Sequence, residues 1–382
     1  MIRILFTGGG TGGHIYPILA VFEELKKILE AQKIDARFYY VGAPGKFKQL
    51  ILSSGIAVSK IFSAKLRRYF DFKNFIDFLI FPISILQAFW KVFWIMPDVL
   101  FSKGGPGSLP VVIACWFYRI PIIVHDSDSI IGLANKLAVK FADKIAVSFS
   151  SAAEDLSKKN QNKIILTGNP IRGSLKSNLE KMAAKSFFGF KEDKPLILIL
   201  GGSQGASKIN DFLLNIAGEL AKDYLVLQQT GVDNFESVRE ELAVALKNFG
   251  PIEKARYKVI PYFENNLADA YAAADIIVSR SSSGVIFELA MMGIPAILIP
   301  LSEKVVGIHQ IKNAYEYAKS GAAVVIEEEN LKPNIFLGAI ERSLKNPDML
   351  KEMSAAAKKF SKPDATKMIA NEIFNFINID KD

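Results

Sequence analysis

The stretch GGGTGGH near the start of the chain combines a glycine-rich turn with a histidine suited to proton transfer. Gly8, Gly10 and Gly13 fit the spacing G-x-G-x-x-G, in which backbone N–H groups approach an anion without obstruction from side chains. His14 follows the last glycine, and an imidazole that titrates near neutrality can accept a proton from an attacking hydroxyl. A histidine that only bonds to the backbone at a helix N-terminus is the structural alternative, and the sequence leaves both open.

The same glycine spacing is typical of nicotinamide and flavin enzymes. The residue at the end of the second strand distinguishes these enzymes from other proteins with a glycine loop. Dinucleotide sites place an acidic residue there to bind the ribose. In this chain the segment ARFYYVG ends in Gly42, and Ala43 follows, without a carboxylate. The sequence therefore disfavours a dinucleotide cofactor.

A second glycine-rich turn, GGSQGAS, opens another helical pattern near the middle of the chain. The hydroxyl of Ser203 can donate to a phosphate oxygen, although a plain tight turn is the alternative. One glycine loop in each half suits a ligand with a diphosphate in one domain and a second substrate in the other.

The segment DIIVSRSSSGVIFELAMMGIPAILIPL forms a third concentration of polar groups after an apolar run. The apolar run ends at Arg280, a serine-rich loop follows, and Glu288 lies one turn into the next helix. A carboxylate there can accept both hydroxyls of a ribose, or it can simply favour the positive end of the helix. Both interpretations remain open.

Short apolar segments alternate with amphipathic helical patterns in both halves of the chain. Apolar strands without polar alternation indicate parallel sheets covered by helices on both faces. We therefore predict an α/β fold with two doubly wound parallel sheets and a ligand cleft between the domains. The break TGNPIRGSLKSN places the domains at 1–168 and 169–360, and the tail 361–382 is predicted to be a helix.

The composition narrows the class of protein. The chain has 382 residues, of which 50% are apolar and 23% charged, and a net charge of +8 fits either anionic partners or solubility alone. The single cysteine, Cys115, excludes an internal disulfide and is predicted to be buried. We expect no signal peptide and no membrane span, because the most apolar stretch, 78–90, contains Pro82 and is shorter than the about 20 residues that a span needs.

The histidines do not form a metal-binding pattern. His14, His125 and His309 are too scattered for a ligand cluster, so we expect neither a metal nor another cofactor.

Five motifs, in this order and spacing, resemble the MurG family of glycosyltransferases, glycosyltransferase family 28: TGGGTGGHIYP, GNPIR, GGSQGAS, SRSSSGVIFELAMMGIPAILIP and HQIKNA. The resemblance extends from the first strand to PDATKMIANEI and covers essentially the whole chain. It implies the GT-B fold, with two Rossmann-like domains facing an interdomain cleft and a final helix that packs back on the first domain. It also implies transfer of N-acetylglucosamine from UDP-N-acetylglucosamine to lipid I, the undecaprenyl-diphospho-N-acetylmuramyl peptide, to form lipid II in peptidoglycan synthesis.

The resemblance implies which residues bind the two substrates. On the donor side these are Arg172, Ser203, Phe263, Ser283, Gly284, Val285, Ile286, Phe287, Glu288 and Gln310. On the acceptor side they are Thr11, Gly12, Gly13, His14, Gly104, Gly105 and Asp128.

Three motifs depart from the pattern of the family. The usual G-x-GGYVSGP reads SKGGPGSLP, HEQN reads HDSD, and SGALTVS reads SSSGVIF. The second change places Asp128 where an asparagine usually contacts substrate.

We predict an inverting transfer in which His14 is the general base and Asp126 a second candidate. The helix behind GGSQGAS is expected to stabilise the departing diphosphate without a metal.

The lipid-linked acceptor implies peripheral docking at the cytoplasmic face of an anionic membrane, with no nucleic-acid partner. Candidate docking residues are Lys65, Arg67, Arg68, Lys73, Phe75, Phe78, Leu79, Ile80 and Phe81. The alternative is that this helix packs in the core, because its later part, 85–94, has to cover the sheet.

Other functions stay open at this point. A diacylglycerol glycosyltransferase or a UDP-sugar epimerase would share the fold, and a non-catalytic nucleotide-sugar binding module would bind UDP without turnover.

Overall fold

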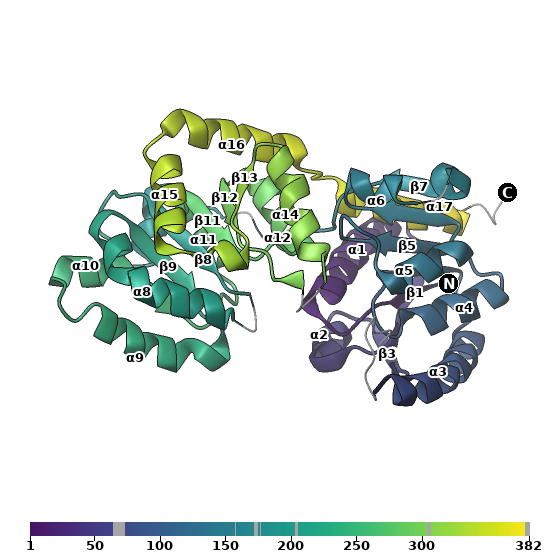
Figure 1. Cartoon of the computed structure of the whole chain (residues 1–382). Coiled ribbons are helices and arrows are strands. Elements are labelled where there is room, and N and C mark those ends of the chain that lie inside the picture. The colour runs from purple at the N-terminus through teal and green to yellow at the C-terminus, as the bar shows by residue number, and fades with distance from the viewer. Residues whose placement is uncertain are drawn as a thin grey trace. The chain divides into compact units, whose positions relative to one another are not determined.

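The computed structural model describes residues 1–63, 73–156, 158–171, 175, 177–202, 205–303 and 307–378. The chain divides into two compact units (Figure 1). Unit 1 comprises Met1–Arg172 and Lys362–Asp382, and unit 2 comprises Gly173–Ser361.

Unit 1 is built on a seven-stranded parallel sheet of order β3-β2-β1-β4-β5-β6-β7. Its strands are β1 (Ile2–Thr7), β2 (Ala36–Gly42), β3 (Ala57–Lys60), β4 (Val99–Ser102), β5 (Ile122–Asp126), β6 (Lys144–Val147) and β7 (Ile164–Leu166). Its α-helices are α1 (Gly12–Ala31), α2 (Lys48–Ser53), α3 (Lys73–Ile95), α4 (Ser108–Phe117), α5 (Leu133–Ala138), α6 (Ser150–Glu154) and α17 (Ala365–Asn378). The central strands are apolar and fully buried, because helices cover both faces of the sheet.

The last helix, α17, belongs to the core of unit 1. It packs against α1, and its buried residues Ile369 and Ile373 share a cluster with Ile4 and Phe6 of β1. The hydroxyl of Thr366 also donates to the backbone oxygen of Ile171, over a distance of 3.4 Å. The C-terminal helix α17 thus belongs to unit 1 and packs beside α1 (Figure 1).

Unit 2 has a six-stranded parallel sheet of order β10-β9-β8-β11-β12-β13. Its strands are β8 (Leu196–Leu200), β9 (Leu225–Gln229), β10 (Tyr257–Ile260), β11 (Ile276–Ser279), β12 (Ala296–Leu298) and β13 (Ala323–Val325). Its α-helices include α7 (Lys181–Phe187), α8 (Ser207–Asp223), α9 (Phe235–Ala245), α10 (Pro251–Arg256), α11 (Leu267–Ala273), α12 (Ser283–Met292), α14 (His309–Lys319), α15 (Pro333–Leu344) and α16 (Pro347–Phe360).

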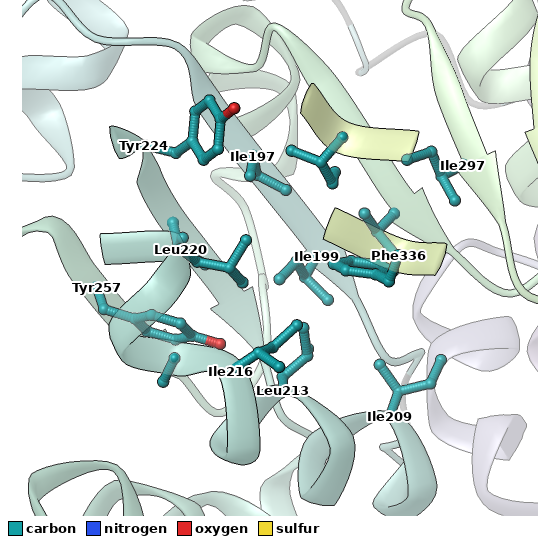
Figure 2. Packing of buried hydrophobic residues seen from close by; sticks show 14 of the residues in the cluster. Ile197, Ile199, Ile209, Leu213, Ile216, Leu220, Tyr224, Tyr257, Ile297 and Phe336 are labelled. Atoms are coloured by element: carbon teal, nitrogen blue, oxygen red, sulfur yellow. The ribbon is translucent and has the colours of Figure 1, made fainter. Parts of the chain in front are cut away.

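The core of unit 2 forms where α8 and α15 cover the sheet. Figure 2 shows Ile197 and Ile199 of β8 meeting Leu213 and Ile216 of α8 and Phe336 of α15. These side chains are almost completely buried, which fixes β8 and the start of the loop that follows it.

Both sheets share one strand order. With β1 or β8 as the first strand, each follows the order 3-2-1-4-5-6, and unit 1 has one further strand. The chain direction across the sheet reverses between β1 and β4 and between β8 and β11, and ligands bind such sheets at the carboxyl ends of the strands beside this point. The predicted α/β fold with two doubly wound parallel sheets is confirmed. Within the described residues, no helix has the length and apolar character needed to cross a membrane.

Candidate active site

His14 lies at the reversal point of the sheet in unit 1, in the first turn of α1. Strand β1 ends at Thr7, the glycine loop follows, and α1 begins at Gly12. The Nδ1 atom of His14 is 2.7 Å from the hydroxyl of Thr11. The side chain therefore pairs with a hydroxyl rather than with the backbone, and the half-buried ring keeps an accessible part.

The loop after β4 packs directly against this histidine. The backbone N–H of Gly9 donates to the oxygen of Gly104 at 2.9 Å, so the loops after β1 and β4 are joined. Gly105 has φ +87°, and a Cβ added there would lie 2.7 Å from Nε2 of His14. Glycine is needed at this position both for the left-handed backbone and for the space that the ring occupies.

Lys103, in the same loop, is a functional candidate that the sequence analysis missed. Its side chain is only 2% exposed, and its Nζ donates to Oγ of Ser127. Burial lowers the pKa of Lys103 to about 8, while the charges of Asp126 and Asp128 act in the opposite direction. The sequence does indicate this position, because Lys103 directly follows the strand segment VLFS. A residue at that point lies at the carboxyl edge of the sheet, where ligands bind.

The electrostatic environment keeps His14 neutral at physiological pH. Loss of hydration lowers its pKa to about 4, and the nearby positive charge of Lys103 adds to this effect. A neutral imidazole has a lone pair that can accept a proton, although a pKa of about 4 makes it a weaker base than an ordinary histidine.

Asp126 is held in place, because both of its carboxylate oxygens accept N–H hydrogen bonds. Its Oδ1 accepts from the backbone of Asp128 at 3.0 Å, and its Oδ2 accepts from Asn135 at 2.8 Å and from the backbone of Gly132 at 3.1 Å. Burial and the charge of Asp128 raise its pKa. The Asp126 carboxylate therefore organises the loop 126–135.

A metal site would need several clustered ligands. Among the described residues, no group of three or more His, Cys, Asp or Glu side chains could hold a metal ion.

The corresponding edge of unit 2 contains neutral hydrogen-bonding groups. Gln229, at the end of β9, donates from Nε2 to the oxygen of Gly202 at 2.9 Å and accepts from the backbone N–H of Phe263 at 3.1 Å. A Cβ at Gly205 would clash with the oxygen of Thr230. Gln229, which the sequence analysis also missed, ties the second glycine loop to the segment around Phe263.

Three predicted donor residues of the α12 region have different surroundings. The Tyr271 hydroxyl donates to Oε2 of Glu288 at 2.8 Å, and Oε1 of Gln310 accepts from the backbone of Leu301 at 3.1 Å. Gly284 faces open space, because a Cβ there would meet nothing within 4 Å. Glu288 and Gln310 are thus positioned by neighbouring groups.

Some other predicted donor residues face the core. Ile286 and Phe287 are 0% and 1% exposed and offer no surface to a ligand. Phe263 is 2% exposed, and its ring packs edge to face against Phe188 at a centroid distance of 6.0 Å. Ser283 is also buried, Val285 is half-buried, and Arg172 and Ser203 lie outside the described residues.

Comparison with known proteins shows relatedness along both units. The profile of the "Glycosyltransferase family 28 N-terminal domain" matches residues 4–147, and that of the "Glycosyltransferase family 28 C-terminal domain" matches residues 196–369. A Bacillus cereus protein, 38% identical over 375 residues, covers 98% of this chain and 99% of its own length. It is named "UDP-N-acetylglucosamine--N-acetylmuramyl-(pentapeptide) pyrophosphoryl-undecaprenol N-acetylglucosamine transferase 2". The chain belongs to glycosyltransferase family 28.

Two solved structures agree with the GT-B fold of this family 28 chain. The crystal structure of Acinetobacter baumannii MurG superposes with a TM-score of 0.74 at 24% identity and covers 98% of this chain and 100% of that one. The UDP-GlcNAc 2-epimerase of Neisseria meningitidis, bound to UDP-GlcNAc, gives a TM-score of 0.67 at 15% identity with the same coverage. At these identities the likeness shows the shared fold.

The family 28 chain also exposes aromatic side chains on α3 and α4, which pack against each other. The apolar surface consists of Leu86 (71% exposed), Trp90 (62%), Phe93 (51%), Trp94 (67%), Trp116 (53%) and Phe117 (60%). Only part of 85–94 covers the sheet, through the fully buried Ala88 and Val92. The later part of the helix thus packs one face on the core, as the alternative expects, and exposes its aromatic face.

The other candidate docking residues are only partly described. Lys65, Arg67 and Arg68 lie outside the described residues, as do the side chains of Lys73, Phe75, Phe78 and Leu79, whereas Ile80 and Phe81 are half-buried.

Proposed function

We propose that the chain transfers N-acetylglucosamine from UDP-N-acetylglucosamine to the muramyl sugar of a polyprenyl-diphospho-linked muramyl peptide, lipid I, with inversion at the anomeric carbon. The observation that carries the proposal is a neutral His14 at the reversal point of the first sheet, in a chain whose full-length relative is named for this reaction. The transfer produces lipid II and free UDP.

In the proposed reaction His14 acts on the acceptor hydroxyl. The hydroxyl oxygen attacks the anomeric carbon from the face opposite UDP while its proton passes to the imidazole. The bond between the anomeric carbon and the diphosphate oxygen breaks, and its electron pair leaves with UDP. If Nδ1 carries the ring proton and donates to Thr11, the lone pair at Nε2 is available for the acceptor.

Unit 2 is the proposed donor site. The N-terminus of α8, with Ser203 in the preceding loop and Arg172 from GNPIR, would receive the diphosphate. Glu288 would accept the ribose hydroxyls, while Gln310 would bind the sugar. The backbone of α12 around the half-buried Gly284 would face the base, and Ile286 and Phe287 would support this helix from the core.

Unit 1 is the proposed acceptor site. At the beginning of α1, Thr11 and Gly13 are exposed and Gly12 is half-buried, and Gly104 and Gly105 form the opposing loop. Asp128 is half-buried beside Asp126 and would contact the acceptor.

The exposed aromatic surface of α3 and α4 is the proposed membrane-docking surface. Arg119 and Lys140 are exposed beside it, and Trp116 contacts Phe141 at a ring-centroid distance of 5.1 Å. Aromatic side chains with basic neighbours suit the interface of an anionic leaflet, so we place the enzyme at the cytoplasmic face of the membrane as a peripheral protein.

Vesicle co-sedimentation tests the docking surface. Trp94→Glu should release the protein from phosphatidylglycerol vesicles at low salt. Val244→Glu, which changes a side chain 72% exposed on unit 2, is the matched control and should leave binding intact. Equal binding by both variants, or no binding by the unaltered protein, would contradict the docking surface.

Radiolabelled UDP-N-acetylglucosamine tests the function. It is offered with lipid I, with lipid I lacking its peptide, with diacylglycerol, and alone. Label should pass to lipid I. Transfer to diacylglycerol would identify a different acceptor class. Conversion of the donor in the absence of an acceptor would indicate an epimerase, an enzyme class in which a solved structure has a similar fold. Binding of UDP without turnover in any arm would indicate a binding module.

A further inference from the structure

Lys103 occupies an unusual position for a lysine, because it is almost fully buried in the candidate acceptor site. Its backbone N–H donates to the oxygen of Thr7 at 2.9 Å, which places it at the reversal point between β1 and β4. Only 2% of the residue is exposed. A side chain buried to this extent has no room to bind the acceptor directly, so its role has to be exerted through neighbouring groups.

The Lys103 ammonium begins a chain of side-chain hydrogen bonds. It donates to Oγ of Ser127, and Ser127 in turn donates to Oδ1 of Asn169 at 3.0 Å. Asn169 is 2% exposed, and the oxygen of the preceding Gly168 lies 3.0 Å from Nε2 of His125. Ser127, which follows Asp126 at the end of β5 and precedes Asp128, therefore bonds directly to Asn169. Lys103 fastens the same serine to the loop after β4.

Lys103 interacts electrostatically with two carboxylates and with His14. Asp126 and Asp128 raise the pKa of Lys103 against the effect of burial, and Lys103 lowers the pKa of His14. His125, at the end of β5, is neutral because burial lowers its pKa well below the ordinary value. From β2, the neutral hydroxyl of Tyr40 donates to the oxygen of Gly8 at 2.7 Å. The geometric link between Lys103 and these carboxylates is Ser127, which accepts the hydrogen bond from the ammonium and lies between Asp126 and Asp128 in the sequence.

We propose that Lys103 is a positioning residue of the acceptor site: through its hydrogen bond to Ser127, its ammonium balances the Asp126 and Asp128 carboxylates and holds this segment beside His14. Asp128 stands where the family's usual motif has asparagine, and the buried lysine supplies the charge that compensates this additional carboxylate. The consequence for turnover rests on the proposed function, whereas the electrostatic relation between Lys103 and His14 does not.

The first experiment measures the His14 titration by NMR in the full-length protein, without substrate. Lys103→Met should raise the pKa of His14 by about one unit, since a nearby positive charge has been removed. Lys103→Gln, a second variant in case Lys103→Met does not fold, should do the same. The signal is assigned by its loss in His14→Asn. An unchanged titration in a folded Lys103 variant would overturn the proposal.

A matched control separates electrostatics from general loss of stability. Lys185 of unit 2 is also buried, at 3% exposure, and its Nζ lies 3.2 Å from Asp275. Lys185→Met should lower the thermal midpoint without moving the His14 titration. A shift of His14 in this variant as well would show that the effect of Lys103 is not local.

A double-mutant cycle tests the pairing with Asp128. Lys103→Met should lower kcat about 100-fold with little change in the KM for the donor, because misplaced catalytic groups cost this much. In Lys103→Met/Asp128→Asn, about tenfold of that loss should return, since removal of the extra carboxylate restores the charge balance. Losses that simply multiply would contradict the pairing. If the unaltered protein transfers no sugar, the proposed function fails, and the NMR titration still decides the role of Lys103.

Discussion

In unit 1, the edge where the strand order reverses gathers titratable side chains: His14 after β1, Lys103 after β4 and Asp126 at the end of β5. In unit 2, the corresponding edge is mainly built from amides. Gln228 donates to Asn210 at 2.9 Å, and Gln229 binds the loop after β8 at 2.9 Å. Two sheets with one topology thus present different chemistry at equivalent positions.

At the edge of unit 2, the carboxylate of Glu328 is paired with two cations. Arg280 contacts Glu328 at 2.7 Å, and Lys208 contacts the other oxygen of the same carboxylate at 3.1 Å. Burial would raise the pKa of Glu328, but these two partners outweigh it and lower the pKa. The first edge therefore gathers titratable groups that can exchange protons, whereas the second edge gathers amides and an ion-paired carboxylate.

The largest effect should come from His14→Ala. Loss of the general base should lower kcat about 1,000-fold, because general acid–base catalysis typically contributes 10²–10⁴. Calorimetric binding of UDP should stay within about twofold, since the proposed UDP site lies on the other sheet. Near-normal turnover would remove the division between the two edges.

Gly105→Ala should have the next largest effect, because its Cβ would meet Nε2 of His14 at 2.7 Å and the N of Gly9 at 3.0 Å. A displaced imidazole and an alanine at φ +87° should together lower kcat about 100-fold. Gly338→Ala, on an open face of α15, is the control and should raise stability by about 0.5–1 kcal/mol. Retained turnover in Gly105→Ala would show that the contact with His14 is unimportant.

The sequence predicts the features that depend on local patterns. Apolar strands followed by glycine loops indicate two Rossmann-like sheets, and His14 after such a loop marks the candidate base. The burial of Lys103 could not be predicted, because its neighbour Ser127 is on a different strand connection. Gln229 was missed for the same reason, since its partners Gly202 and Phe263 come from two other loops. The orientation of Ile286 and Phe287 depends on how α12 packs, which the motif SSSGVIFE does not specify.

The fall of kcat/KM at acid pH should distinguish His14 from an ordinary histidine. Burial and Lys103 hold the pKa of His14 at about 4. We therefore expect kcat/KM to stay level between pH 7 and 5 and to fall about tenfold per unit below pH 4, where the protonated ring cannot accept a proton. In unfolded chains this histidine titrates near 6.5, so folding stability should fall as the pH drops from about 6.5 to 4. An inflection of kcat/KM near pH 6.5 would contradict the environment described for His14.

Gln229→Leu should affect recognition and spare proton transfer. It removes two hydrogen bonds and leaves the oxygen of Gly202 and the N–H of Phe263 without this partner, which should weaken UDP binding about tenfold. The His14 titration should not move. Gln161→Leu, at an exposed glutamine in unit 1 that bonds to backbone oxygens, serves as the control and should change neither quantity. A shifted His14 titration in Gln229→Leu would mean that the two edges are not independent.

Lys208→Ala should have the smallest effect, and it gives the sharpest contrast with Lys103. Both lysines face carboxylates, but the side chain of Lys208 is 71% exposed, whereas Lys103 is 2% exposed. Water screens the exposed charge, so such pairs contribute roughly 0.2–1 kcal/mol, and Arg280 still holds Glu328 when Lys208 is removed. UDP binding should therefore weaken by less than about fivefold in calorimetry. A fall in kcat as large as the about 100-fold expected for Lys103→Met would show that the charge in unit 2, too, is part of the catalytic arrangement. The contrast between the two edges would then no longer hold.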